Sequence, residues 1–423
     1  MRHVSAQRRI LLRAAFAGVL SSLMNTMAVA KTLEVSSEDR GESEAAKAIL
    51  LSAQTRLGMN LVGQLANGRQ KGTNIVVSPA SLASILSFVE LGGSDPMRSA
   101  IRRTLGIDPD TKGRADEDME ALRSSVVAMV GKSGKDAPLA LANLLVFDPS
   151  TRPRQSALHA LSHAGADALV DDLTMPKTID RVNGLVRQAT HGLIPSIMEK
   201  APEELGLVAV NALYFKDRWK MPFDPARSRI EPFQPLLGNK VDVMMMHSHF
   251  GKFAFRQDDH FIGVELPYEK EGFKLVVITT KSTPVGAPDF AAVDGWLGGQ
   301  GFDVNEGEVG LPKIFLSAEE ELLSPLDALG LRAARLVPGS LNRFSSSPLT
   351  ITGVVQRLEL RINEEGTEAA AATAVRARTT SVHSYVTMIV DKPFMFALRD
   401  QKTGLFPFVG YIGAPPKIPS NKS

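Results

Sequence analysis

Few residues of this chain have the types and spacing that catalysis or metal binding requires. His159 and His163 stand four residues apart in a stretch with helical periodicity, so they could share a metal ion, although such a pair is more often part of a solvated helix face. The sequence lacks the nucleophile-elbow, zinc-protease and phosphate-loop motifs, and it contains no cysteine for thiol catalysis or thiolate ligands. We therefore expect a protein that is not an enzyme and that uses neither a metal nor a cofactor.

The segment of residues 363–381, with the sequence NEEGTEAAAATAVRARTTS, is compatible with two structures. Alanine is the best helix former, so intrinsic propensity alone favours a helix. Alternation favours a strand, because from Thr367 onward every second residue is small and uncharged, whereas Glu368, Arg376 and Arg378 all belong to the other set. No proline interrupts the stretch, so each residue can donate a ladder hydrogen bond. The alternation predicts a strand with one buried face of small residues and one solvated face.

The first 30 residues are typical of a secretory signal peptide. Basic residues precede an apolar stretch from Ala14 to Val29, and Ala28 and Ala30 are the small residues of a cleavage site. Removal of this segment takes away four arginines and leaves 44 basic groups against 46 acidic ones, so the net charge changes from +2 to −2. The mature chain also has no uncharged apolar run of about 18 residues. We expect no nucleic-acid partner and no membrane insertion of the mature form. We expect a secreted or periplasmic protein, and export without cysteines is typical of a bacterial one.

The rest of the chain has the pattern of an α+β protein, with helices dominating the first half and strands the second. We expect helices at residues 45–65, 79–91, 108–136, 153–166, 178–190 and 290–297. We expect strands at residues 74–77, 139–147, 208–215, 241–246, 251–256, 263–266, 273–280, 309–316, 356–363, 385–390, 394–398 and 406–412.

Several short motifs resemble those of the serpin family, in the family's order. The segment Glu364–Thr373 resembles the hinge of the reactive-centre loop in inhibitory serpins. Further matches are Asn74–Ser81 (NIVVSPAS), Asn211–Phe223 (NALYFKDRWKMPF), Val243–Met246, Glu265–Tyr268, Leu311–Lys313, Asp391–Phe394 and Phe408–Pro415. The resemblance implies a single serpin domain at residues 46–415, preceded by the signal peptide at 1–30 and a flexible leader at 31–45 and followed by a tail at 416–423.

The resemblance implies the serpin fold, with three β-sheets, eight or nine helices and an exposed reactive-centre loop. It also implies a metastable inhibitor whose partner is a target serine protease. The protease attacks the loop and forms an acyl-enzyme, and the cut loop then inserts as a new strand of the largest sheet, which leaves a covalent complex that cannot deacylate. We expect a monomer. The alternative is a non-inhibitory serpin, which would be a binding protein or a plain protease substrate.

The resemblance assigns roles to single residues of this sequence. The hinge, whose buried face must be small and uncharged, comprises Glu364, Glu365, Gly366, Thr367, Glu368, Ala369, Ala370, Ala371, Ala372 and Thr373. The shutter, which controls opening of the sheet, comprises Ser78, Ser81, Asn211 and Gln356, and Gln356 stands where the family usually has histidine. The breach, where insertion begins, comprises Trp219, Lys313 and Glu364, with an ion pair expected between the last two.

The reactive bond has more than one candidate. The family's usual loop length places it at Thr380-Ser381, which would suit a protease with a small or permissive primary pocket. The bond Arg378-Thr379 is the alternative, because arginine suits a trypsin-like pocket that contains a buried acid. Arg376 offers a weaker third position.

Overall fold

The computed structural model describes residues 37–67, 69, 72–111, 113–131, 137–200, 204–270, 272–282, 290–367 and 385–415. The chain forms two units, Met1–Ala46 and Lys47–Ser423, and the sheets belong to the second. The helices are α2 (Ser37–Asn67), α3 (Pro79–Gly92), α4 (Asp95–Thr104), α5 (Arg114–Val130), α6 (Gln155–Ala164), α7 (Pro176–Ala189), α8 (Asp294–Leu297), α9 (Leu323–Leu326) and α10 (Arg332–Arg335). Within the described ranges, no helix has the length and apolar character needed to cross a bilayer.

The strands follow in chain order. They are β1 (Ile75–Val77), β2 (Leu139–Phe147), β3 (Asp167–Val170), β4 (Leu207–Phe215), β5 (Asp217–Arg218), β6 (Arg229–Phe233), β7 (Val241–His247), β8 (Gly251–Gln257), β9 (Phe261–Pro267), β10 (Phe273–Thr280), β11 (Asp303–Pro312), β12 (Ile314–Glu321), β13 (Ile351–Ile362), β14 (Gly366–Thr367), β15 (Val386–Ile389), β16 (Phe394–Asp400) and β17 (Phe408–Ile412).

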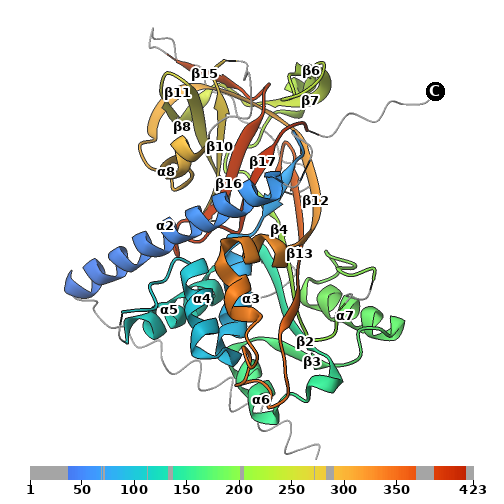
Figure 1. Cartoon of the computed structure of the whole chain (residues 1–423). Coiled ribbons are helices and arrows are strands. Elements are labelled where there is room, and N and C mark those ends of the chain that lie inside the picture. The colour runs from blue at the N-terminus through green and yellow to red at the C-terminus, as the bar shows by residue number, and fades with distance from the viewer. Residues whose placement is uncertain are drawn as a thin grey trace, which may run out of the picture. The chain divides into compact units, whose positions relative to one another are not determined.

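A five-stranded sheet with the order β12-β13-β4-β2-β3 positions the hinge (Figure 1). Its central strand β4 is buried at every residue, as its nearly continuous apolar sequence LVAVNALYF requires. The strands β12 and β2 pair antiparallel with β13 and β4, respectively, but β13 and β4 run parallel, from Ile351 opposite Leu207 to Glu359 opposite Tyr214. Parallel pairs are slightly less stable per residue than antiparallel ones. The strands β2 and β3 at the edge of the sheet also run parallel, so the β4–β13 contact, called the seam below, is the parallel pair in the interior of the sheet.

Helices cover both faces of the five-stranded sheet (Figure 1). On one face, Leu213 and Phe215 of β4 join the main core together with the buried side of α3. On the other face, Val210 and Ala212 pack with Val182 of α7 and with the residues that follow this helix. The alternation of β4 side chains between two cores explains why the strand carries no charged residue.

A ten-stranded sheet forms the other large layer, with the order β1-β17-β16-β10-β9-β8-β11-β7-β6 and with β15 also paired to β11. The strand β15, which follows the segment expected to be the reactive-centre loop, lies parallel to β11 from Val386 opposite Gly307 to Ile389 opposite Gly310. A Cβ atom at Gly307 would lie 2.1 Å from the carbonyl oxygen of Val386. The close approach of β15 therefore requires glycine at this position.

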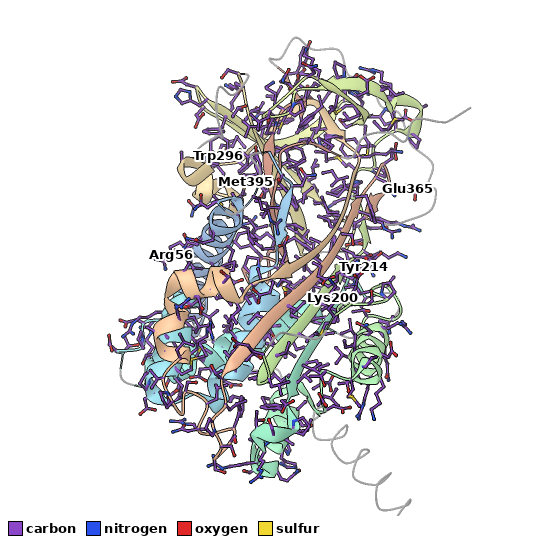
Figure 2. The ribbon with its side chains drawn as sticks, turned by 45° about the vertical axis from the view of Figure 1, so that its right-hand side comes forward. Arg56, Lys200, Tyr214, Trp296, Glu365 and Met395 are labelled. Carbon is purple, nitrogen blue, oxygen red and sulfur yellow. The ribbon has the colours of Figure 1, made fainter. Side chains whose placement is uncertain are left out.

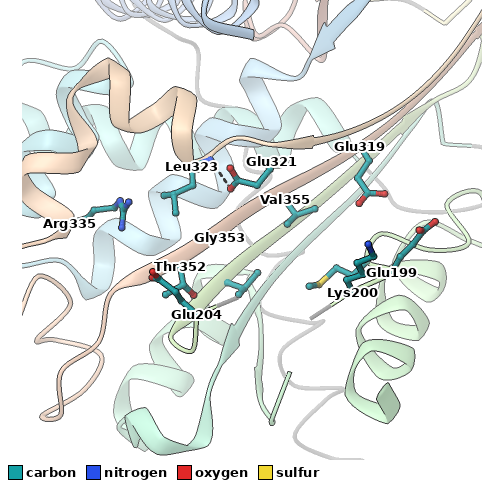
Figure 3. Close-up of a pocket in the computed structure, with 12 residues that line it drawn as sticks. Glu199, Lys200, Glu204, Glu319, Glu321, Leu323, Arg335, Thr352, Gly353 and Val355 are labelled. Atoms are coloured by element: carbon teal, nitrogen blue, oxygen red, sulfur yellow. Dashed lines mark hydrogen bonds between the residues drawn. The ribbon is translucent and has the colours of Figure 1, made fainter. Parts of the chain in front are cut away.

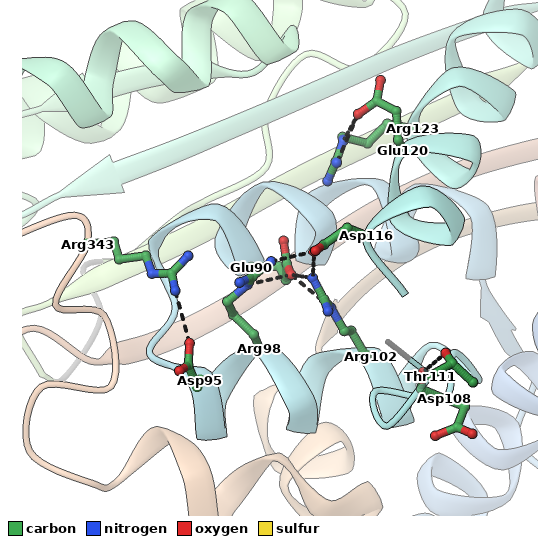
Figure 4. Close-up of polar contacts among 10 residues, drawn as sticks. All are labelled: Glu90, Asp95, Arg98, Arg102, Asp108, Thr111, Asp116, Glu120, Arg123 and Arg343. Carbon is green, nitrogen blue, oxygen red and sulfur yellow. Dashed lines mark hydrogen bonds and ion pairs between the residues drawn. The ribbon is translucent and has the colours of Figure 1, made fainter. Parts of the chain in front are cut away.

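Buried ion pairs fix α3 against α4 and α5 (Figure 4). The Glu90 carboxylate of α3 is 2% exposed and accepts hydrogen bonds from Arg98 at 2.8 Å and from Arg102 at 3.0 Å, both on α4. Both arginines also bond to Asp116 of α5. Loss of one partner would leave a buried charge uncompensated, so the cluster holds the three helices in one arrangement.

The expected α+β fold class with three sheets is confirmed, since the described residues form the ten-stranded sheet, the five-stranded sheet and a two-stranded sheet of β5 and β14. Several element boundaries differ from expectation. The helix expected at residues 108–136 is α5, which spans only Arg114–Val130, and the strand expected at residues 356–363 already begins at Ile351 as β13. Helix α2 begins at Ser37, so it extends into the stretch expected to be a leader. The single strand expected at residues 309–316 is two strands, because β11 and β12 belong to different sheets on either side of Lys313.

Candidate functional site

The hinge begins as a tight hairpin at the end of β13. Asn363 and Gly366 exchange backbone hydrogen bonds of 2.9 and 3.3 Å, and the Asn363 side chain accepts from the amide of Glu365 at 3.1 Å. Gly366 has φ 147°, and a Cβ atom there would lie 2.3 Å from the carbonyl oxygen of Asp217. Only glycine fits both the dihedral angle and the space. The chain therefore reverses direction immediately after β13, close to Glu365, which Figure 2 labels.

The two residues after this turn are already a strand. Gly366 and Thr367 form β14, which pairs antiparallel with Arg218 and Asp217 of β5. The Thr367 side chain is fully buried, and its hydroxyl lies 3.0 Å from the hydroxyl of Tyr268. Burial raises the pKa of the Tyr268 phenol, so this group remains protonated. The placement of Thr367 agrees with the buried face that the alternation of the sequence predicts.

An aromatic stack supports the hinge from the side of β5. The Trp219 ring stacks on Tyr268 with centroids 4.3 Å apart, and its indole Nε1 donates to the carbonyl of Asn363 at 2.9 Å. The Trp219 amide donates to the carbonyl of Glu365 at 2.8 Å, and the Phe223 amide donates to that of Glu364 at 2.8 Å. These contacts hold the backbone of the turn at three successive residues.

The expected ion pair of the breach is present. The Lys313 ammonium lies 2.8 Å from Glu364 Oε1, and the Ser228 hydroxyl donates to the same oxygen at 2.6 Å. Burial of the Glu364 carboxyl opposes its ionisation, but the hydrogen bonds from Lys313 and Ser228 outweigh burial and hold its pKa below the ordinary value. The ionised carboxylate therefore stabilises the folded hinge.

The Glu364 carboxylate makes the effect of a Lys313 substitution depend on pH. Because the pKa of Glu364 is lowered by folding, its stabilising contribution is present above the unfolded-chain pKa of about 4.3 and is lost as the pH falls through the folded-state value. We expect Lys313→Met to reduce the free energy of unfolding by about 1 kcal/mol at pH 7, since Lys313 is partly exposed. Urea unfolding at pH 7 and pH 3 measures this difference, which should be smaller at pH 3 than at pH 7.

The matched control is Lys252→Met, which removes an exposed lysine elsewhere on the surface. It should change stability by less than about 0.5 kcal/mol at either pH. An equal loss of stability for Lys313→Met at pH 7 and pH 3 would show that the lysine acts through packing rather than through the Glu364 charge.

The shutter residues form one buried hydrogen-bond network at the start of α3. The Gln356 Oε1 accepts from the Ser78 amide at 2.8 Å, and its Nε2 lies 3.0 Å from the Ser81 hydroxyl and 3.2 Å from Asn211 Oδ1. Asn211 Nδ2 in turn donates to Asn143 Oδ1 at 2.7 Å. The network joins β13 to β4 and β2 behind the parallel seam, so separation of β13 from β4 breaks it.

Several sequence-predicted residues lie outside the described residues. These are the hinge residues from Glu368 to Thr373, the reactive-bond candidates Thr380-Ser381 and Arg378-Thr379, and Arg376. His159 and His163 are described, and both are exposed on α6 with ring centroids 4.4 Å apart. In the described part of the chain, no group of three or more His, Cys, Asp or Glu side chains is arranged to hold a metal ion.

Three residues of the site have no role in the sequence-based prediction. Tyr268 belongs to a motif that carries the resemblance, but nothing in the motif indicates its hydrogen bond to Thr367. Asn143 could be suspected as the one polar side chain within the apolar strand LALANLLVF. Ser228 follows the short 3-10 turn before β6, and its sequence context gives no signal of a bond to Glu364.

A family model and several known proteins match this chain over most of its length. A family model described as Serpin (serine protease inhibitor) matches residues 52–415. The chain is 27% identical to a leukocyte elastase inhibitor of Bos taurus, over 86% of this chain and 99% of that protein. It is 30% identical to Serpin-ZX of Hordeum vulgare, over 86% of this chain and 97% of that protein.

Among solved structures, thyroxine-binding globulin in complex with thyroxine matches 88% of this chain and 100% of its own, with a TM-score of 0.75 and 20% identity. At that identity the likeness concerns the fold alone. The family match, by contrast, spans the shutter, the breach and the hinge in one continuous range. The chain belongs to the serpin family, whose members are described as serine protease inhibitors rather than enzymes.

Proposed function

We propose that this protein is an irreversible suicide-substrate inhibitor of a serine protease. The protease serine attacks the carbonyl of the reactive bond, the peptide bond breaks, and an acyl-enzyme ester forms while the new amino terminus leaves. The freed loop then continues β14 as a strand between β4 and β13 and carries the protease with it. Distortion of the protease active site leaves the ester intact, so the complex is covalent.

The observation that carries this proposal is the state of the hinge. Gly366 and Thr367 already form a strand at the end of the parallel seam, with Thr367 buried and its backbone paired to β5. A loop that continues from there runs antiparallel to both β4 and β13. Insertion thus replaces one parallel ladder by two antiparallel ladders, and about a dozen new hydrogen-bonded pairs would contribute on the order of 10 kcal/mol.

The hinge chemistry favours inhibition over the alternative of a binding protein or plain substrate. The likeness to thyroxine-binding globulin concerns a protein whose printed title describes a complex with thyroxine. A member that only binds a ligand has no need for an insertable hinge, whereas the residues 366–373 are all small except Glu368, which falls on the solvated set. We further propose that the protein acts as an exported monomer, after removal of residues 1–30.

A protease panel tests the proposal. We expect incubation with elastase-like, subtilisin-like and trypsin-like serine proteases to give, for at least one of them, a band that survives boiling in denaturant at the summed mass of the two proteins. The released C-terminal fragment, identified by mass spectrometry, should begin at Ser381, or at Thr379 if Arg378 is the reactive residue. Cleavage by every protease without such a band would exclude inhibition and favour the plain-substrate alternative.

A further inference from the structure

The hairpin at the hinge fixes the register of any strand that continues from it. Because Asn363 and Gly366 pair with each other, a strand that continues this hairpin would place Thr367 opposite Ile362. Each later residue of the loop would then lie opposite the residue one position earlier in β13. On its other side, Thr367 is paired with Asp217, just beyond the end of β4. If both pairings continue antiparallel along the loop, the pairing with β13 places Arg376 opposite Gly353. The pairing with β5, continued along β4, places Arg376 opposite Val208. Gly353 and Val208 are already partners in the parallel ladder, so the two registers agree.

The register also assigns each loop residue to a face of the sheet. Thr367 is on the core face with Ile362, so Glu368, Ala370, Ala372, Ala374 and Arg376 would be on the opposite face. Ala370 and Ala372 would lie next to Tyr214 and Ala212, on the face that α7 and its following segment cover. Small residues suit such a covered stretch, which explains why alanines occupy this part of the otherwise solvated set.

Arg376 would emerge from this covered stretch at a cavity of about 590 Å³ (Figure 3). The lining includes Gly353 and Val208 at the seam, and its charged members are Glu199, Lys200, Glu204, Glu319, Glu321 and Arg335. Figure 3 shows Glu319 and Glu321 on one side of the β13 ribbon and Glu199 and Lys200 on the other. Four carboxylates therefore face two cations around the position that the register gives to Arg376.

Of the two cations in the lining, Lys200 and Arg335, the second is already paired. The Arg335 guanidinium forms bonds of 2.7 and 2.6 Å with Asp327, which lies outside the lining. Glu319 bonds to Arg357 at 3.0 Å, and Glu321 accepts from the backbone amides of Leu323 and Val354. Glu199 and Glu204 are exposed, and no salt bridge joins either of them to a described residue, although the charge of Glu204 contributes to raising the pKa of Arg335. The lining thus carries more negative than positive charge, and within the described ranges neither Glu199 nor Glu204 has a direct ion-pair partner.

We propose, on the basis of the inhibitory function proposed above, that this cavity receives the guanidinium of Arg376 once the loop has been cut and inserted. Glu204, which lies three residues before β4, is the first of its ion-pair partners. Toward the start of the inserted strand, Glu368 would lie opposite Arg361 in the same register, so Glu368 and Arg376 would each meet a charge of the opposite sign. The sequence of the loop therefore encodes its final place in the sheet as well as its susceptibility to a protease.

Calorimetry of the cut and uncut protein tests this inference. The protein is cut with a subtilisin-type protease, and mass spectrometry confirms that the cut lies after Arg376. We expect Arg376→Ala to lower the Tm of the cut form by about 1 °C and Arg376→Glu to lower it about twice as much. The Tm of the uncut form should change by less than about 0.3 °C, and 0.5 M NaCl should reduce the effect on the cut form.

A double-mutant cycle identifies the partner. Glu204→Gln should lower the Tm of the cut form in the wild-type background but not in the Arg376→Ala background. The control Glu117→Gln, which removes an exposed carboxylate on α5, should leave the Tm of the cut form unchanged. Suppose that the cut wild-type protein has a much higher Tm than the uncut one, but that neither Arg376→Ala nor Arg376→Glu changes the Tm of the cut form. This result overturns the role of Arg376 and leaves the proposed function intact. A cut wild-type protein that gains no stability overturns insertion itself and, with it, the proposed function.

Discussion

Replacement of Thr367 by arginine is expected to convert the protein from an inhibitor into a substrate that is cut and released. The Thr367 side chain is fully buried beside Tyr268, at the first position of the inserting strand. A guanidinium there would cost several kcal/mol of desolvation or would push the strand out of the seam. Since each 1.4 kcal/mol changes a rate ratio about tenfold, insertion would lose the competition with hydrolysis of the acyl-enzyme. Titration of residual protease activity should show that at least about ten molecules of inhibitor are consumed for each protease trapped.

The conservative variant Thr367→Ser separates the charge from the loss of threonine. Serine is small and keeps the hydroxyl that contacts Tyr268, so its stoichiometry of inhibition should stay within about twofold of the wild type. If Thr367→Arg still formed the covalent complex with unchanged stoichiometry, the buried hinge face would have no part in trapping.

Removal of the Gln356 amide is expected to destabilise the intact protein by about 2–4 kcal/mol. The variant Gln356→Leu deprives the Ser78 amide of its acceptor and breaks the contacts with the Ser81 hydroxyl and with Asn211 Oδ1, all of which are buried. Buried polar groups without partners carry their full desolvation cost. We expect the Tm of the uncut protein to fall by roughly 3–5 °C, which differential scanning calorimetry measures directly.

The variant Gln356→His is the informative comparison, because an imidazole can donate at one nitrogen and accept at the other. It should recover at least half of the stability that Gln356→Leu loses. Equal Tm values for the leucine and histidine variants would mean that volume, rather than hydrogen bonding, determines the contribution of this position.

The fold was predictable wherever local pattern and burial agree. The apolar strand at 139–147 and the helix that begins at Pro79 occur as expected, the latter because Ser78 caps it and Pro79 occupies its first turn. The short strands β3 and β6 were not predictable, since they carry mostly exposed or partly exposed residues without a clear alternation. The break at Lys313 was also hidden, because it depends on which sheet each half of the strand joins.

The candidate site was predictable mainly through family resemblance. Propensity alone favoured a helix from Thr367 onward, but the described beginning of this segment is a strand, because pairing with β5 and burial against Tyr268 override local preference. The contact between Lys313 and Glu364 joins residues 51 positions apart, and no periodicity indicates it. Cavities such as the one around Gly353 depend on several elements at once, so the sequence gives no direct sign of them.

The parallel pairing of β15 with β11 affects how long the uncut protein remains in its active form. The loop is fastened at both ends, by β14 on one side and by the four residues of β15 on the other. An uncut loop could lie along β4 only after β15 had peeled away from β11, whereas a cut loop is free of that restraint. If insertion occurs as proposed, an uncut molecule loses inhibitory activity at the rate at which β15 detaches from β11. The lifetime of the active protein is then set by the detachment rate of this one short strand rather than by the rate of global unfolding.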